Sequence, residues 1–182
     1  MSKAFQAHRL DVAAFAQQRA SLSDQDPLPR YERLASELHR PAPEAVVAWQ
    51  VHGEQRTAVD GGSRPALHLR VEADLPLTCQ RCMGEVRTNV MVDRHFVFVP
   101  DEDTAAALDD ASEDDVLALA ADFNLHALIE DELLLALPLV PRHEQCPEAV
   151  QLSVQDADFE AAQEQQAHPF AALAKLKGDK PA

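Results

Sequence analysis

Two pairs of residues in this sequence have the types and the spacing of metal ligands. The first pair lies in Cys79-Gln80-Arg81-Cys82, and the second pair, His143 and Cys146, follows some sixty residues later at a similar spacing. Two thiolates at this spacing can hold one zinc ion from a tight turn, and a tetrahedral site needs two more sulfur or nitrogen ligands. If the fold brings the pairs together, Cys79, Cys82, His143 and Cys146 form a Cys₃His zinc site.

The same cysteines allow two other interpretations. They could be reduced residues in a turn and a loop, or Cys79 and Cys82 could act as a redox pair. A thioredoxin-like role is disfavoured because no strand–helix–strand pattern surrounds the pair. The chain has three cysteines, and so small and odd a number argues against a disulfide framework.

Three consecutive carboxylates, Glu130-Asp131-Glu132, lie inside a predicted helix, and Glu132 falls on its apolar face. A carboxylate in such a position costs free energy unless it is paired. We therefore expect an arginine partner, with Arg81 and Arg87 as candidates, or a position at the rim that water reaches. Acid–base catalysis by these carboxylates is possible, but nothing in the sequence indicates a pocket around them. The chain also contains no phosphate-binding glycine loop and no nucleophile elbow.

Basic side chains recur in the strand-forming part of the chain. The candidate contacts to RNA or to a protein partner are Arg70, Arg81, Arg87 and Arg94. The residues that would complete a basic strip on the sheet are Arg56, Arg64, His68 and His95. Such a strip can contact RNA locally even in an acidic protein. The alternative is that these are ordinary solvated strand residues.

The elements that must position these residues begin with a sheet. Val47–Val51 alternates apolar and polar residues, residues 60–62 are a hairpin signal, and Leu67–Ala73 shows the cleanest alternation in the chain. A third strand is predicted over Val86–Val99. These patterns predict an antiparallel sheet within residues 44–120, with one face in water.

Helices are predicted before the sheet. Asp11 can cap a short helix that runs to about Ala20, and a polar loop over Ser21–Asp26 follows. A second helix is predicted from Pro29 to Leu38, since its apolar residues recur at helical spacing. Prolines after it end the helical part of the chain.

The C-terminal part combines an acidic loop, a helix and a tail. Residues 101–115 hold eight acidic side chains and no basic one, which predicts a solvated loop. Residues 116–120 could form a short strand, and a helix capped by Asn124 is predicted over Leu125–Leu137. A polar, glutamine-rich linker over Asp156–Ala167 then leads to a short amphipathic helix at Phe170–Lys177, which we expect to dock on a surface.

These elements predict an α+β fold. The chain has 182 residues, of which 46% are hydrophobic, so we expect one domain over 1–182 with a real core. Its parts are a helical segment at 1–43, a sheet-rich core at 44–150, and an acidic linker with a docking helix at 151–182. The antiparallel sheet could be barrel-like, and N-terminal, central and C-terminal helices pack on it.

Charge and hydropathy exclude several classes of protein. The net charge is −15, and all of it lies in residues 101–182, which carry four basic and nineteen acidic side chains. Phosphates would be repelled, which argues against a protein that coats nucleic acid by bulk electrostatics. The charge favours a soluble protein whose C-terminal part faces water or a basic partner. The longest uncharged apolar run, Leu133–Val140, is far too short to span a membrane. No signal peptide follows Lys3, and we expect a cytoplasmic protein.

Three segments carry a resemblance to a known family. They are Leu-Thr-Cys-Gln-Arg-Cys at 77–82, Glu-Asp-Glu-Leu-Leu-Leu-Ala-Leu-Pro-Leu-Val-Pro at 130–141, and Pro-Phe-Ala-Ala-Leu at 169–173. In this order, and over nearly the whole chain, the sequence resembles the YceD-like family, whose members are described as large ribosomal RNA subunit accumulation proteins. Some relatives carry a fuller cysteine set at the second position, which looks like a metal site, and His143 and Cys146 stand there in this chain.

The resemblance implies a bacterial cytoplasmic protein that is not an enzyme. Such a protein supports the synthesis, processing or stability of large-subunit (23S) ribosomal RNA, and its partner is ribosomal RNA or a basic ribosomal protein. Membrane and DNA partners are not expected. The alternative is a small zinc-binding or redox-active enzyme that uses Cys79 and Cys82, and the absence of a catalytic motif favours the first function.

Overall fold

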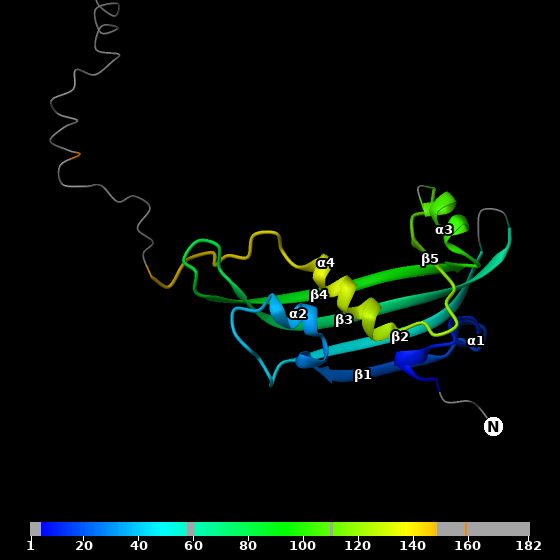
Figure 1. Cartoon of the computed structure of the whole chain (residues 1–182), viewed down its shortest axis with the longest axis horizontal. Helices are drawn as coiled ribbons and strands as arrows, with labels where there is room; N and C mark the ends of the chain where they lie inside the picture. Colours follow the sequence, from blue (N-terminus) through cyan, green and yellow to red (C-terminus); the bar gives the residue numbers. More distant parts are fainter. Residues whose placement is uncertain (1–4, 58–60, 110, 149–158, 160–182) are drawn as a thin grey trace, which may run out of the picture. The chain divides into compact units, whose positions relative to one another are not determined.

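The structure is a computed structural model that describes residues 5–57, 61–109, 111–148 and 159. The chain divides into two compact units, Met1–Cys146 and Pro147–Ala182, and every element described below belongs to the first. That unit is a five-stranded sheet, in the order β1-β2-β3-β4-β5, with helices packed on it (Figure 1). The predicted α+β fold class is therefore confirmed.

The centre of the sheet is an antiparallel meander of three long strands, as predicted. The strands are β2 (Val46–Thr57), β3 (Ser63–Thr78) and β4 (Glu85–Val99). The β2–β3 ladder ends at the pair Thr57 and Ser63, on either side of the predicted hairpin turn.

Strand β1 (Ser21–Pro27) shows that the predicted polar loop over Ser21–Asp26 is wrong. The segment pairs antiparallel with β2 along its whole length, at the edge of the sheet. An edge strand meets water on one face and along one row of backbone groups, so polar residues are tolerated there. Asp26 is the one buried residue of this strand.

Strand β5 (Asp115–Ala118) forms the opposite end of the strand order and pairs parallel with β4. The connection between them includes helix α3 (Glu102–Asp109), as parallel neighbours require a crossover. The sheet is therefore mixed and open, and the expectation of a barrel-like, wholly antiparallel sheet is corrected on these two points.

Helix α3 also corrects the prediction of a solvated loop over residues 101–115. The Asp101 carboxylate accepts a hydrogen bond from the backbone N–H of Thr104 at 2.8 Å, and acidic residues in the first turn suit the helix dipole. Ala105 packs with Val99 and Val116 in a small separate core. The high density of acidic residues suggested a loop, but the cap at Asp101 and a few apolar contacts stabilise a helix here.

The other helices cover one face of the sheet (Figure 1). They are α1 (Val12–Gln17), α2 (Glu32–Ser36) and α4 (Leu125–Ala136), with single 3₁₀ turns η1 (Ala7–Arg9) and η2 (Leu28–Arg30). The predicted caps are confirmed, because Asp11 accepts from the N–H of Ala14 and Asn124 from those of His126 and Ala127. The predicted helix over Pro29–Leu38 exists as η2 followed by α2.

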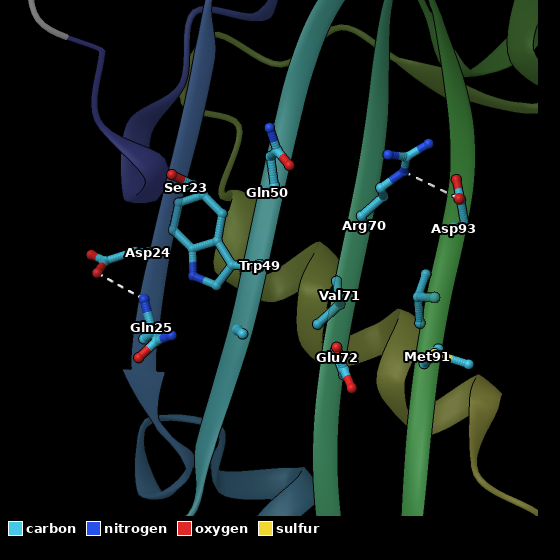
Figure 2. A pocket seen from close by; sticks show the side chains of 12 residues that line it. Ser23, Asp24, Gln25, Trp49, Gln50, Arg70, Val71, Glu72, Met91 and Asp93 are labelled. Carbon is cyan, nitrogen blue, oxygen red and sulfur yellow. Dashed lines mark hydrogen bonds and ion pairs between the residues drawn. The ribbon is translucent and has the colours of Figure 1, made fainter.

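Alternation along β3 places the core on the helix-covered face. Residues with odd numbers from Leu67 to Leu77 are buried, whereas Arg70, Glu72 and Asp74 are exposed on the opposite face. Figure 2 looks onto that opposite face, with α4 behind the strands. We call it the open face, and it is the wet face that the sequence predicted.

At Gly53, strand β2 packs closely against α1. A Cβ atom there would lie 2.7 Å from both the ring and the carbonyl oxygen of Phe15 and 2.9 Å from the Cα of Ala16. We expect Gly53→Ala to lower the free energy of unfolding by about 2–3 kcal/mol, because backbone atoms must shift. Gly84→Ala is the comparison, since its Cβ would make one ordinary contact, 3.5 Å from the Sγ of Cys82, and both variants are measured with a chelator present so that metal binding does not differ. Equal stability of the two variants in urea unfolding would contradict the packing described.

Two predicted segments, the linker over Asp156–Ala167 and the helix over Phe170–Lys177, lie outside the described residues. Their docking role stays a prediction. Among the residues that the structure describes, no helix has the length and apolar character needed to span a membrane.

Candidate functional site

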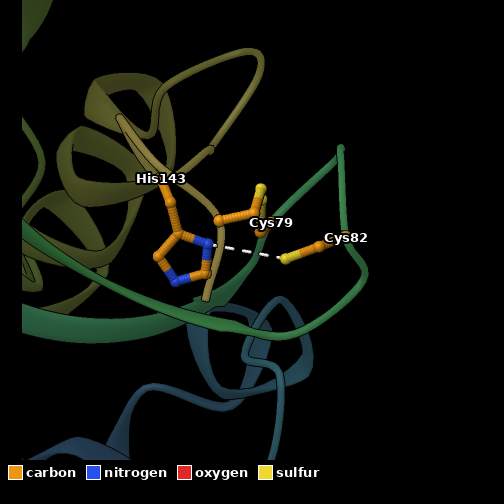
Figure 3. A group of neighbouring side chains, drawn as sticks. Cys79, Cys82 and His143 are labelled. Atoms are coloured by element: carbon orange, nitrogen blue, oxygen red, sulfur yellow. Dashed lines mark hydrogen bonds between the residues drawn. The ribbon is translucent and has the colours of Figure 1, made fainter. Parts of the chain in front are cut away.

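The two predicted ligand pairs meet in space. Cys79 and Cys82 lie in the turn between β3 and β4, and His143 and Cys146 lie in the segment that follows α4. One ligand atom from each of the four residues lies within 4.8 Å of every other. Figure 3 shows Cys79 and Cys82 on the turn with the His143 ring directed at them. The condition that the sequence left open, that the fold brings the pairs together, is met.

Backbone hydrogen bonds explain why the turn holds this shape. The N–H of Cys79 donates to the carbonyl of Gly84 at 2.8 Å, and the N–H of Met83 donates back to Cys79 at 2.9 Å. Met83 has a positive φ of 59°, which closes the turn. The N–H of Gln80 donates to the carbonyl of Pro141 at 2.8 Å, so the turn is joined to the segment that carries the second pair.

The hydrogen bonds of His143 fix which ring nitrogen faces the thiols. Its Nε2 lies 2.9 Å from the carbonyl oxygen of Glu85, which can only accept, so Nε2 carries the proton. Nδ1 is then the free nitrogen, and it lies 3.5 Å from the Sγ of Cys82. A histidine ligand whose other nitrogen donates to a carbonyl is typical of protein zinc sites.

The site favours thiolate at Cys79. Burial alone would raise the pKa of this thiol, but backbone N–H groups of Cys82, His143 and Arg81 lower the pKa to about 5. The pKa of Cys146 is raised, because its thiol is desolvated and lies beside the other two sulfur atoms. A divalent cation would relieve the repulsion among the sulfurs. Three sulfur donors and one imidazole nitrogen fit zinc in a closed tetrahedral set.

The carboxylate run on α4 has a structural task. Glu130 accepts hydrogen bonds from the backbone N–H groups of Arg33 (2.8 Å) and Leu34 (3.3 Å) and from the Arg33 guanidinium at 2.9 and 3.0 Å. Asp131 accepts from the same guanidinium at 2.6 Å. The two carboxylates thus join the start of α2 to α4.

Glu130→Ala tests this junction. We expect the free energy of unfolding to fall by about 1–2 kcal/mol, because two backbone N–H groups lose a charged acceptor while the half-exposed Arg33 returns to water. Asp131→Ala is the matched control and should cost less than about 0.5 kcal/mol. Chemical denaturation of both variants measures the difference, and a less stable Asp131 variant would contradict the role assigned to Glu130.

Glu132 is buried, so the expectation that it reaches water at the rim is wrong. Burial raises the pKa of its carboxyl, and the positive charge of Arg94 partly opposes that rise. The prediction that Arg81 or Arg87 pairs with Glu132 is also wrong, because the arginine near Glu132 is Arg94. Arg94 projects toward the helix-covered face, paired in register with Leu69, and there it forms an ion pair with Asp115.

The four candidate arginines do not share one surface. Arg70 and Arg87 lie on the open face, Arg94 lies on the other face, and Arg81 lies in the cysteine turn. Three of them form ion pairs: Arg70 with Asp93, Arg87 with Asp74, and Arg94 with Asp115. The predicted basic strip is therefore interleaved with carboxylates.

The two histidines predicted for that strip do lie together. The rings of His68 and His95 stack at 4.0 Å between centroids, with 12° between their planes. Each ring has a carboxylate beside it, Asp93 for His68 and Glu54 for His95. A carboxylate therefore lies beside each ring, so this part of the predicted strip is not purely basic.

A buried polar cluster, which the sequence did not reveal, centres on Asp26. Its carboxylate accepts from the Trp49 indole N–H at 2.7 Å, from the Tyr31 hydroxyl at 2.9 Å and from Arg30, and the Nδ1 of His126 lies 3.2 Å away. Asp26 is only 2% exposed. The signal that could have found it is the alternation hidden in Ser21–Pro27, where Asp26 and Leu22 face the core side.

This cluster predicts loss of stability in acid. Burial would raise the pKa of Asp26, but the hydrogen bonds from Trp49 and Tyr31 and nearby positive charge hold it below the usual 3.8. Burial lowers the pKa of His126 below its usual 6.5, with Asp26 opposing the shift.

Both folded-state pKa values are depressed, so both contributions are present above the unfolded pKa and are lost as the pH falls. The His126 contribution declines first, below pH 6.5, and the Asp26 contribution declines below pH 3.8. We expect urea unfolding to show stability falling from neutral pH downward, with the first phase missing in His126→Gln. A stability that rises between neutral pH and about pH 5 would contradict this.

The sequence of this chain is similar to that of known proteins. A family model described as "Large ribosomal RNA subunit accumulation protein YceD" matches residues 67–177. Over 111 residues the chain is 34% identical to the large ribosomal RNA subunit accumulation protein YceD of Haemophilus influenzae, a match that covers 59% of this chain and 63% of the relative. The chain thus spans less than two thirds of the length of that curated relative. No solved structure matches this chain.

Proposed function

This chain belongs to the YceD family of large ribosomal RNA subunit accumulation proteins, and from that membership we propose that it supports the accumulation of large-subunit ribosomal RNA. It acts in the bacterial cytoplasm as a binding protein rather than as an enzyme. The observation that carries the proposal is the family match itself, because residues 67–177 include most of β3, all of β4 and α4, and both ligand pairs.

A structural zinc ion completes this proposal. Cys79, Cys82, His143 and Cys146 would hold it, and the ion would supply charge neutralisation and a fixed crosslink. The crosslink joins the β3–β4 turn to the segment after α4. Four protein ligands leave no open coordination position, which supports a structural rather than a catalytic ion.

The cellular test is the ratio of large-subunit to small-subunit ribosomal RNA. Deleting the gene should lower that ratio, and a plasmid copy should restore it. Pulse labelling of RNA in the same strains separates the stages: slower appearance indicates synthesis, precursor build-up indicates processing, and faster decay indicates stability. An unchanged ratio in the deletion strain would overturn the proposed function.

A redox enzyme that uses Cys79 and Cys82 is the second candidate. The lowered pKa of Cys79 favours it, since thiolates are the reactive form of cysteine. Cys82→His separates the candidates, because histidine can ligate zinc but cannot form a disulfide. A variant that retains zinc and restores the RNA ratio excludes the redox enzyme. A variant that retains zinc and fails to restore it supports the redox enzyme.

A further inference from the structure

The open face carries two adjoining pockets, and none of the four candidate zinc ligands lines either of them. The larger, of about 750 Å³, lies over β1 to β4, and the smaller, of about 350 Å³, lies beside it over β2 to β4. Ala48 and Glu72 line both, so the two form one continuous surface. Figure 2 shows the residues of the larger pocket. We call this continuous surface the open-face groove.

Carboxylates outnumber cations in the open-face groove. Its acidic residues on the open face are Glu44, Glu72, Asp74 and Asp93, and its basic residues are Arg70 and Arg87. Each arginine is already ion-paired with a carboxylate of the same groove, Arg70 with Asp93 and Arg87 with Asp74, each at 3.2 Å. The groove therefore offers excess negative charge.

Two of the carboxylates, Glu44 and Glu72, have no ion-pair partner among the described residues. Glu72 accepts a hydrogen bond from the side-chain amide of Asn89 at 3.1 Å, and this donor carries no charge. Glu44, in the smaller pocket, has no ion-pair partner in the part of the chain that the structure describes.

Apolar surface lies between these carboxylates. Met91 is 71% exposed at the groove, and Val46 is 48% exposed beside Ala48. Lysine and arginine side chains combine a long apolar stem with a charged end, so a surface of this composition can cover the stem and pair the charge.

From charge complementarity we infer that the open-face groove binds an extended, lysine- and arginine-rich protein segment. This deepens the proposed function and rests on it, since it identifies the direct partner as a basic protein rather than RNA. Phosphates would meet excess carboxylate, and the two guanidinium groups already have acidic partners. A basic segment would gain ion pairs with the unpaired carboxylates.

Binding of a peptide of Lys-Arg-Ala repeats tests the inference. Fluorescence anisotropy should show salt-sensitive binding to the full chain, and Glu44→Lys/Glu72→Lys should weaken it at least about tenfold. Glu37→Lys/Glu113→Lys is the matched control, with the same charge change at exposed residues outside the groove, and should weaken binding by less than about threefold. Equal loss in both variants would mean that the peptide responds to net charge alone, which overturns the inference.

Two further readouts locate the partner and separate this inference from the proposed function. In NMR titrations with the peptide, the amide signals of Ala48, Glu72 and Met91 should shift. If a single-stranded RNA oligonucleotide shifts them and the peptide does not, RNA is the partner and the inference is overturned. In cells, Glu44→Lys/Glu72→Lys should fail to restore the RNA ratio in the deletion strain. Full restoration by that variant would overturn the inference that the open-face groove binds a basic segment, and the proposed function would remain intact.

Discussion

Replacing Cys79 with serine should abolish zinc binding and lower the free energy of unfolding by more than about 4 kcal/mol, because a structural zinc site contributes its binding energy directly to folding. Cys79 is fully buried, and its thiol contacts every other member of the site through sulfur or backbone N–H groups. A hydroxyl oxygen is a poor zinc ligand beside two remaining thiols.

The control for this variant is Met83→Asn, in the same turn. Met83 is 65% exposed and has a positive φ, a conformation that asparagine tolerates, so stability should change by less than about 0.5 kcal/mol. Chemical denaturation with zinc present and with a chelator measures both proteins. If the chelator leaves the wild-type unfolding curve unchanged, the structural role of the ion is contradicted.

Asp26→Ala should lower the free energy of unfolding by about 3–5 kcal/mol, the second of the two largest effects. The change leaves the Trp49 indole and the Tyr31 hydroxyl without their acceptor, and burial makes each unpaired donor costly. It also leaves Arg30 without its carboxylate partner.

Asp24→Ala is the matched control, since Asp24 is exposed in the same strand and should cost less than about 0.5 kcal/mol. Differential scanning calorimetry measures both variants. Near-UV circular dichroism of the folded Asp26 variant should also change, because Trp49 loses its hydrogen bond. Equal melting temperatures for the two variants would show that the buried cluster contributes little.

The sequence predicted the parts of the fold that rest on strong periodicity. The alternation from Leu67 to Ala73 placed β3, and the caps Asp11 and Asn124 placed α1 and α4. These signals are local, because each depends on residues within one element. The two ligand pairs were also visible, since the cysteine spacing is itself a local motif.

What the sequence did not predict depends on contacts between distant elements. In strand β1 every residue except Leu22 and Pro27 is polar, so its sequence does not show the alternation of a strand. The ladder with β2 and the hydrogen bonds of Asp26 hold it in the sheet. Helix α3 is acidic, and its few apolar contacts come from β4 and β5. The arginines looked like a basic strip because the sequence does not show which carboxylate lies opposite each of them.

The most direct test of the proposed zinc site is X-ray absorption at the zinc edge on the full chain purified without chelators. We expect one zinc ion per chain, bound by three sulfur atoms at about 2.3 Å and one nitrogen at about 2.0–2.1 Å. Cys146→Ser should reduce the sulfur count to two or remove the metal. Stoichiometric absence of zinc in the wild-type protein, or a disulfide between Cys79 and Cys82 in place of a metal, would contradict it.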